Sequence, residues 1–135
     1  MDVLVTGGTG FIGTHLCREL DDRGHDVTAF SRSPGDAALP DSVDQAVGDV
    51  TAYDSVAEAV EGHDAVVNLV ALSPLFKPKQ GDRRHMEVHL GGTENVVRAA
   101  EAAGVDYLLQ MSALDADSNG PTAYLRAKGK AEEVV

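Results

Sequence analysis

Short apolar runs alternate along the chain with longer stretches whose apolar residues recur every three or four positions. The short runs predict strands and the periodic stretches predict helices. Strands are expected at residues 2–6, 26–31, 45–47, 64–70 and 106–111, and helices at residues 11–23, 54–61, 83–103 and 122–135. Regular alternation of this kind predicts a doubly wound parallel α/β sheet, with the spatial strand order 3-2-1-4-5 that right-handed crossovers produce.

Individual residues sharpen these boundaries. Gly24 and Gly104 are placed to end the first and the longest helix. Asp54 and Thr122 are expected to cap the helices that follow them. The uninterrupted apolar run 65–67 predicts a strand that is covered on both faces.

The chain of 135 residues is long enough for one domain and little more. It stops just after a helix that should lead to a further strand. We therefore expect residues 1–135 to form the N-terminal part of a longer protein, without a C-terminal substrate lobe. The fifth strand would then be a bare sheet edge that needs a cover, either a second copy or a partner in a larger complex.

A glycine-rich turn, Thr-Gly-Gly-Thr-Gly-Phe-Ile-Gly at residues 6–13, joins the first strand to the first helix. Glycines allow a tight turn and a close approach of backbone to phosphate, and the helix N-terminus offers free N–H groups to an anion. The turn predicts a dinucleotide site, and a tight turn with a purely structural role is the alternative. The residues expected at the cofactor are Gly7, Thr9, Gly10, Phe11, Ile12 and Gly13.

The end of the second strand indicates which dinucleotide is bound. Sites that prefer NAD usually carry an acid there, whereas this chain has Ser31 and Arg32. A guanidinium suits a 2′-phosphate, so NADP is expected and NAD is the alternative. Arg32 could also be an ordinary solvated arginine.

The chain resembles the short-chain dehydrogenase/reductase superfamily, in its extended and atypical branch of NAD-dependent epimerase/dehydratase-like proteins. The turn at residues 6–13, the segment Gly-Thr-Glu-Asn-Val-Val at 92–97 and the Tyr-x-x-x-Lys pattern at 124–128 carry the resemblance. It implies that Asp49 and Val50 lie at the adenine and that Leu69, Val70 and Ala71 lie along the adenine ribose. It also implies that Tyr124 and Lys128 contact the cofactor. The family often has Asn where this chain has His89, which alters the implied proton relay.

Three residues are candidates for catalysis: Ser112, Tyr124 and Lys128. Tyr and Lys at i and i+4 share one helix face, and a neighbouring ammonium favours the phenolate form of a tyrosine. Ser112 ends the fifth strand, at the edge of a parallel sheet where ligands bind. The expected reaction is hydride transfer at a nicotinamide, with Tyr124 moving the alcohol proton. A core tyrosine beside a surface lysine is the alternative.

Within the superfamily the chain most resembles the group similar to the Rossmann-type accessory subunit of respiratory complex I. That resemblance keeps two functions open: an oxidoreductase or sugar-nucleotide epimerase/dehydratase-like enzyme, and a dinucleotide-binding structural or assembly subunit without turnover. A flavin- or S-adenosylmethionine-binding domain is a more distant third.

The composition of the chain limits the classes of molecule that it is expected to bind. The net charge of −11 disfavours nucleic acid and anionic membrane surfaces, and no apolar stretch is long enough to insert into a bilayer. A small-molecule substrate is therefore expected. The 14 aspartates and the scarcity of lysine lead to the hypothesis of a halophilic, high-salt cytoplasm, against an ordinary acidic protein. A single cysteine, Cys17, fits a reducing cytoplasm and a core position.

Two weaker signals remain. His85 and His89 lie one helical turn apart, but no third ligand is evident, so no metal site is expected. A basic island either attracts an anionic group of a substrate or merely solvates a loop. It consists of Phe76, Lys77, Lys79, Arg83 and Arg84.

Overall fold

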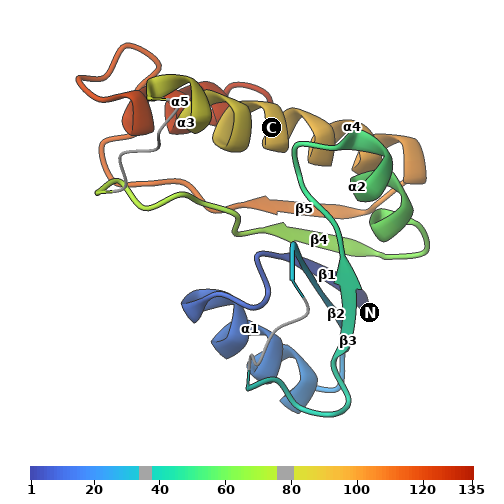
Figure 1. Cartoon of the computed structure of the whole chain (residues 1–135). Coiled ribbons are helices and arrows are strands. Elements are labelled where there is room, and N and C mark those ends of the chain that lie inside the picture. Colours follow the sequence, from blue (N-terminus) through green and yellow to red (C-terminus); the bar gives the residue numbers. More distant parts are fainter. Residues whose placement is uncertain (34–37, 76–80) are drawn as a thin grey trace.

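A computed structural model describes residues 1–33, 38–75 and 81–135 and shows a five-stranded sheet (Figure 1). All strand pairs are parallel and the order is β3-β2-β1-β4-β5, which confirms the predicted topology. The strands are β1 (Asp2–Thr6), β2 (Asp26–Ser31), β3 (Asp44–Val47), β4 (Ala65–Asn68) and β5 (Tyr107–Gln110).

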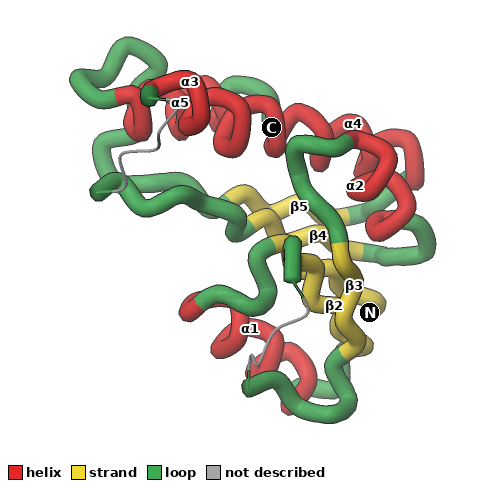
Figure 2. Tube along the Cα trace, in the orientation of Figure 1, coloured by secondary structure: helices red, strands yellow, loops and turns green. Residues whose placement is uncertain are grey.

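Helices cover the two faces of the sheet unequally. They are α1 (Phe11–Asp22), α2 (Tyr53–Val60), α3 (Asp82–His85), the π-helical segment η1 (Met86–Gly91), α4 (Gly92–Ala103) and α5 (Ala123–Glu132). In Figure 2, α1 lies alone on one side of the strands, and the other helices lie on the opposite side. The C-terminal ends of β1, β2 and β4 point into the space between these two layers of helices.

The alternation of side chains along β1 divides the core in two. Leu4 packs with residues of α2 and α4, whereas Val3 and Val5 pack with Cys17 of α1 on the other face. Successive residues of a strand point to opposite faces, so one short apolar run supplies both cores. The predicted core position of Cys17 is confirmed, and burial raises the pKa of its thiol to about 11.

The helix boundaries follow local chemistry with one exception. Thr122 caps α5, because its Oγ1 accepts a hydrogen bond from the N–H of Leu125 at 3.2 Å. Gly104 ends α4 in the left-handed conformation, with φ +72°. The predicted cap at Asp54 is wrong: Ala52 holds the cap position of α2, and Asp54 lies inside the first turn, where its charge favours the helix N-terminus.

The longest predicted helix is continuous from α3 to α4, but its middle is the π-helix η1, which the sequence did not indicate. The hydroxyl of Thr93 donates to the carbonyl oxygen of His89 at 2.7 Å, immediately after this segment. Such π-helical insertions occur often at functional sites. Here the insertion carries the buried residues Val88 and His89.

Strand β5 forms one edge of the sheet, and its residues Tyr107 and Leu109 are exposed, as is Met111 just after it. The sequence predicts a partner for this edge, and that partner stays a prediction. No helix in the described ranges combines the length and the apolar character that crossing a membrane requires.

Candidate functional site

Backbone contacts build the glycine turn and leave no room for a side chain at Gly8 or Gly13. The N–H of Gly7 donates to the carbonyl oxygen of Phe30 at 2.9 Å, and the N–H of Gly10 donates to Gly7 at 3.0 Å. Gly7 has φ +72°, a conformation that glycine adopts without strain. A Cβ atom on Gly13 would lie 2.2 Å from the carbonyl oxygen of Gly7, so α1 packs directly on the turn.

The start of α1 is open to a ligand. Its cap residue, Gly10, makes no side-chain hydrogen bond, which leaves the first N–H groups of the helix available. The side chains of Phe11 and Ile12 are exposed beside it, and Gly13 is buried against the turn. These three predicted residues stand at the helix N-terminus, where backbone N–H groups suit a phosphate.

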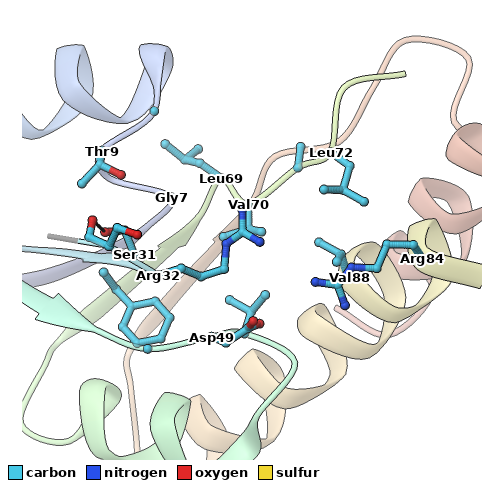
Figure 3. A pocket seen from close by; sticks show the side chains of 16 residues that line it. Gly7, Thr9, Ser31, Arg32, Asp49, Leu69, Val70, Leu72, Arg84 and Val88 are labelled. Carbon is cyan, nitrogen blue, oxygen red and sulfur yellow. Dashed lines mark hydrogen bonds between the residues drawn. The ribbon is translucent and has the colours of Figure 1, made fainter. Parts of the chain in front are cut away.

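A cavity of about 310 Å³ opens between this turn and the ends of the neighbouring strands (Figure 3). Its volume is that of a small ligand pocket. The cavity walls include the predicted cofactor residues at or just after the ends of β1, β2, β3 and β4. These are Gly7, Thr9, Gly10, Ser31, Arg32, Asp49, Val50, Leu69, Val70 and Ala71. The predicted residues inside α1 are not among them. Residues from four separate segments of the sequence are thus brought into one cavity.

Sequence reasoning missed six further wall residues: Phe30, Ser33, Gly48, Leu72, Arg84 and Val88. Phe30 and Gly48 are adjacent, since a Cβ on Gly48 would lie 2.5 Å from the Phe30 ring. Arg84 and Val88 come from α3 and η1, and only the tertiary packing brings that helix to the cavity. A signal did exist for Arg84, which the sequence analysis placed in the basic island.

Asp49 presents a carboxylate to the cavity. Its Oδ1 accepts from the N–H of Thr51 at 2.9 Å and from the Thr51 hydroxyl at 2.8 Å. Partial burial by itself would raise the pKa of Asp49. The hydrogen bonds from Thr51 and the positive charges of Arg84 and Arg32 outweigh burial and hold the pKa below its usual value. The residue is therefore an ionised acceptor at neutral pH.

A buried polar network fixes the ends of the central strands. Thr6 of β1 donates to Oδ1 of Asn68, and Nδ2 of Asn68 donates to Gln110 of β5 at 2.7 Å. Nδ2 also lies 3.4 Å from the hydroxyl of Thr93 in α4. Since buried amides are costly unless paired, this network ties together the ends of β1, β4 and β5, and two of these strands, β1 and β4, lead into cavity walls.

The three predicted catalytic residues lie outside the cavity, at the end of β5 and on α5. Lys128 is 2% exposed, and its Nζ donates to the carbonyl oxygen of Met111 at 2.8 Å, next to Ser112. Burial lowers the pKa of Lys128, with the carboxylate of Glu132 acting in the opposite direction. The alternative of a surface lysine is therefore wrong. The hydroxyl of Ser112 is buried without a hydrogen-bond partner in the described part of the chain.

Tyr124 packs against a pair of stacked imidazoles. Its ring meets His89 edge-on at 5.2 Å and His85 at 6.0 Å between centroids, and the two histidines stack 5.6 Å apart. Nε2 of His89 accepts from the N–H of Leu72, a cavity wall residue, at 3.3 Å. His89 thus connects the cavity to Tyr124. Within the ranges that the structure describes, no cluster of three or more His, Cys, Asp or Glu side chains could hold a metal.

His89 is expected to stay neutral far below the usual range for histidine. Burial lowers its pKa to about 4, helped by the charges of Lys128 and His85, whereas the hydrogen bond from Leu72 acts in the opposite direction. In an NMR titration the His89 imidazole should titrate near pH 4, and the variant His89→Gln identifies its resonance. A midpoint at pH 6 or above would contradict this prediction.

The same pKa predicts how stability depends on pH. The unfolded chain takes up the His89 proton near pH 6.5, whereas the folded chain does so only near pH 4. Stability should therefore fall as the pH drops through this window, by about 3 kcal/mol in total. Urea unfolding at pH 7 and pH 4.5 measures the loss, which should be smaller in His89→Gln.

A profile of NAD(P)H-binding proteins matches residues 7–135, almost the whole chain. The chain belongs to this NAD(P)H-binding family. Its relatives are of the extended short-chain dehydrogenase/reductase type and include oxidoreductases among the curated proteins and an epimerase among the solved structures. The coarse part of the resemblance seen in the sequence is therefore confirmed, including the nicotinamide dinucleotide as the class of ligand.

Three curated relatives illustrate the range of this domain. The 3 beta-hydroxysteroid dehydrogenase/Delta 5-->4-isomerase of Mycobacterium tuberculosis is 37% identical over 82% of this chain and 31% of its own length. The 2-alkyl-3-oxoalkanoate reductase of Stenotrophomonas maltophilia is 39% identical over 83% of this chain and 33% of its own. The L-arabinose 1-dehydrogenase (NAD(P)(+)) of Haloferax volcanii is 36% identical over 79% of this chain and 39% of its own length.

Solved structures agree on the fold. A UDP-galactose 4-epimerase superposes with a TM-score of 0.85 at 25% identity, over 98% of this chain and 50% of its own. MoeE5 in complex with UDP-glucuronic acid and NAD superposes with a TM-score of 0.83 at 26% identity, over 99% of this chain and 48% of its own. The chain thus spans about a third of the length of the curated relatives and about half of these structures.

Proposed function

We propose that the chain binds NADP(H) in preference to NAD(H) and supports hydride transfer between that cofactor and a small alcohol or carbonyl substrate. The observation that carries the proposal is the cavity itself. A glycine-rich turn and an open helix N-terminus form part of its wall, and two arginines and an ionised Asp49 line it as well. Family membership supports the cofactor class, and the oxidoreductase and epimerase relatives support the reaction class.

The residues present fit such a cofactor. Gly7 leaves space where a Cβ would lie 3.2 Å from the N–H nitrogen of Val70, and the first turn of α1 offers unpaired N–H groups to the pyrophosphate. Asp49 would accept a hydrogen bond from the adenine amino group. Arg32 would hold the 2′-phosphate, and the backbone of residues 69–71 would lie along the adenine ribose.

When bound, the nicotinamide ring supplies or accepts the hydride. The chain's own contribution is proton transfer and orientation. Tyr124 gives a proton to the substrate oxygen during reduction and takes it back during oxidation. Lys128 lies one helical turn from Tyr124 on the same helix, and the hydroxyl of Ser112, which has no hydrogen-bond partner among the described residues, would donate to the substrate oxygen.

A second candidate function is dinucleotide binding without turnover, as in the group similar to the complex I accessory subunit. One observation favours it: Nζ of Lys128 is already engaged with the carbonyl oxygen of Met111. Such a protein would bind the cofactor equally well and reduce no carbonyl compound.

Titration by NADPH and NADH fluorescence tests the cofactor proposal. The wild type should bind NADPH at least about tenfold more tightly, because a charge-assisted phosphate contact contributes about 1.5–3 kcal/mol. Arg32→Gln should remove most of this preference, whereas Arg23→Gln, which removes a surface arginine paired with Glu19 on α1, should not. Equal affinity of the wild type for the two cofactors, or tighter NADH binding, would refute NADP preference.

A further inference from the structure

We infer that Arg84 is a second specificity-determining residue of the cofactor cavity and contacts the 2′-phosphate of NADP(H) together with Arg32. This inference rests on the proposed function and adds to it a residue from a different layer of the fold. Arg32 follows β2, whereas Arg84 belongs to α3 on the helical layer above the sheet.

The first observation is position. Arg84 and Val88 form the cavity wall that lies across from Thr9 and Ser31, and Figure 3 shows the Arg84 side chain running along this wall beside Val88. The Arg84 side chain is 25% exposed, whereas that of the adjacent Arg83 is 82% exposed and forms no part of the cavity. Of the basic island, Phe76, Lys77 and Lys79 lie outside the described residues, whereas Arg84 faces the cavity and Arg83 faces solvent.

The second observation is the balance of charge at this end of the cavity. Asp49 carries a negative charge that would repel a phosphate, and a single arginine would only neutralise it. Arg32, Arg84 and Asp49 all line the cavity, and the positive charges of both arginines lower the pKa of this carboxylate. Two guanidiniums facing one carboxylate leave a positive excess, on a chain whose net charge is −11.

The third observation is the tether that holds Arg84 in place. Its Nη1 lies 3.3 Å from Oε2 of Glu87, and the other oxygen of Glu87 pairs with Nε of Arg83 at 2.9 Å. One carboxylate is shared by two arginines, so Glu87 orients Arg84 without cancelling both charges. The remaining N–H donors of a guanidinium are suited to a phosphate, which it can bind through two parallel hydrogen bonds.

These observations favour the 2′-phosphate over the pyrophosphate as the contact of Arg84. The glycine turn and the open end of α1, which lie across the cavity from Arg84, would hold the pyrophosphate in the proposed function. Arg84 lies with Asp49, at the adenine side. The loss of binding affinity that we predict for an Arg84 variant is therefore specific to ligands that carry the 2′-phosphate.

The test compares Arg84→Gln with Arg83→Gln in the whole chain. Both variants remove one arginine from Glu87, so any general effect on α3 is common to the two. Kd values for NADPH and NADH come from fluorescence titration, and those for 2′,5′-ADP and 5′-ADP from calorimetry. Circular dichroism and the unfolding midpoint confirm the fold, and Arg84→Lys retains the charge without the planar fork.

Arg84→Gln should raise the Kd for NADPH and for 2′,5′-ADP about tenfold, with less than about a twofold change for NADH and 5′-ADP. The Kd values of Arg84→Lys for NADPH and 2′,5′-ADP should fall between those of Arg84→Gln and wild type, and the Kd values of Arg83→Gln should match those of wild type. Unchanged NADPH binding in Arg84→Gln would overturn the inference, and so would equal losses for all four ligands. A wild type that binds neither dinucleotide would instead overturn the proposed function and this inference with it.

Discussion

Gly13→Ala is expected to abolish cofactor binding and to destabilise the domain by about 3 kcal/mol or more. The new Cβ would lie 2.2 Å from the carbonyl oxygen of Gly7 and 2.7 Å from the Cα of Gly8. Both are backbone atoms, which cannot rotate away as a side chain does. Either α1 moves away from the sheet or the turn opens, and in both cases the N–H groups at the start of α1, which we propose bind the pyrophosphate, lose their positions.

The matched control is a second helical glycine. A Cβ on Gly91 would have no neighbour closer than the carbonyl oxygen of Met86 at 3.9 Å. Gly91→Ala should therefore leave stability unchanged or increase it by about 0.5–1 kcal/mol, because alanine loses less backbone entropy than glycine. Urea unfolding and NADPH titration of both variants measure the contrast. A Gly13→Ala protein with wild-type stability and affinity would show that the tight packing of α1 on the turn is unimportant.

Tyr124→Phe is expected to reduce turnover by about 10²–10⁴-fold while leaving the Kd for NADPH nearly unchanged. The substitution removes the only atom of the side chain that can carry a proton and keeps the ring that packs on His85 and His89. NADPH consumption with a panel of ketones and aldehydes identifies a substrate for the wild type, and the variant is then compared on that substrate.

Tyr107→Phe provides the control, since Tyr107 lies exposed on β5 and its hydroxyl serves no proposed step. If Tyr124→Phe turns over as fast as this control, Tyr124 is not the proton donor. If the wild type binds NADPH tightly and reduces none of the carbonyl compounds, the non-catalytic function becomes the better description of the chain.

The elements that sequence reasoning placed well are those set by local chemistry. Gly104 and Thr122 end and begin helices as predicted, because capping depends on a few neighbouring atoms. The prediction that Asp54 caps α2 was wrong because a carboxylate is favourable either at the cap or inside the first turn of a helix. The sequence pattern does not distinguish these two positions. The π-helix η1 gave no periodic signal, because it shifts the helical register by a single residue.

The sequence by itself determined the parallel sheet and its strand order, which follow from the periodicity of apolar residues, and the glycine turn, which follows from the spacing of glycines at residues 7, 8, 10 and 13. Only the tertiary structure decided that Arg84 faces the cavity while Arg83 faces solvent, that Lys128 is buried, and that His85 and His89 pack against Tyr124. The reason is physical. Burial, charge balance and pKa depend on which distant segments pack together, and the residue types along one segment do not carry that information.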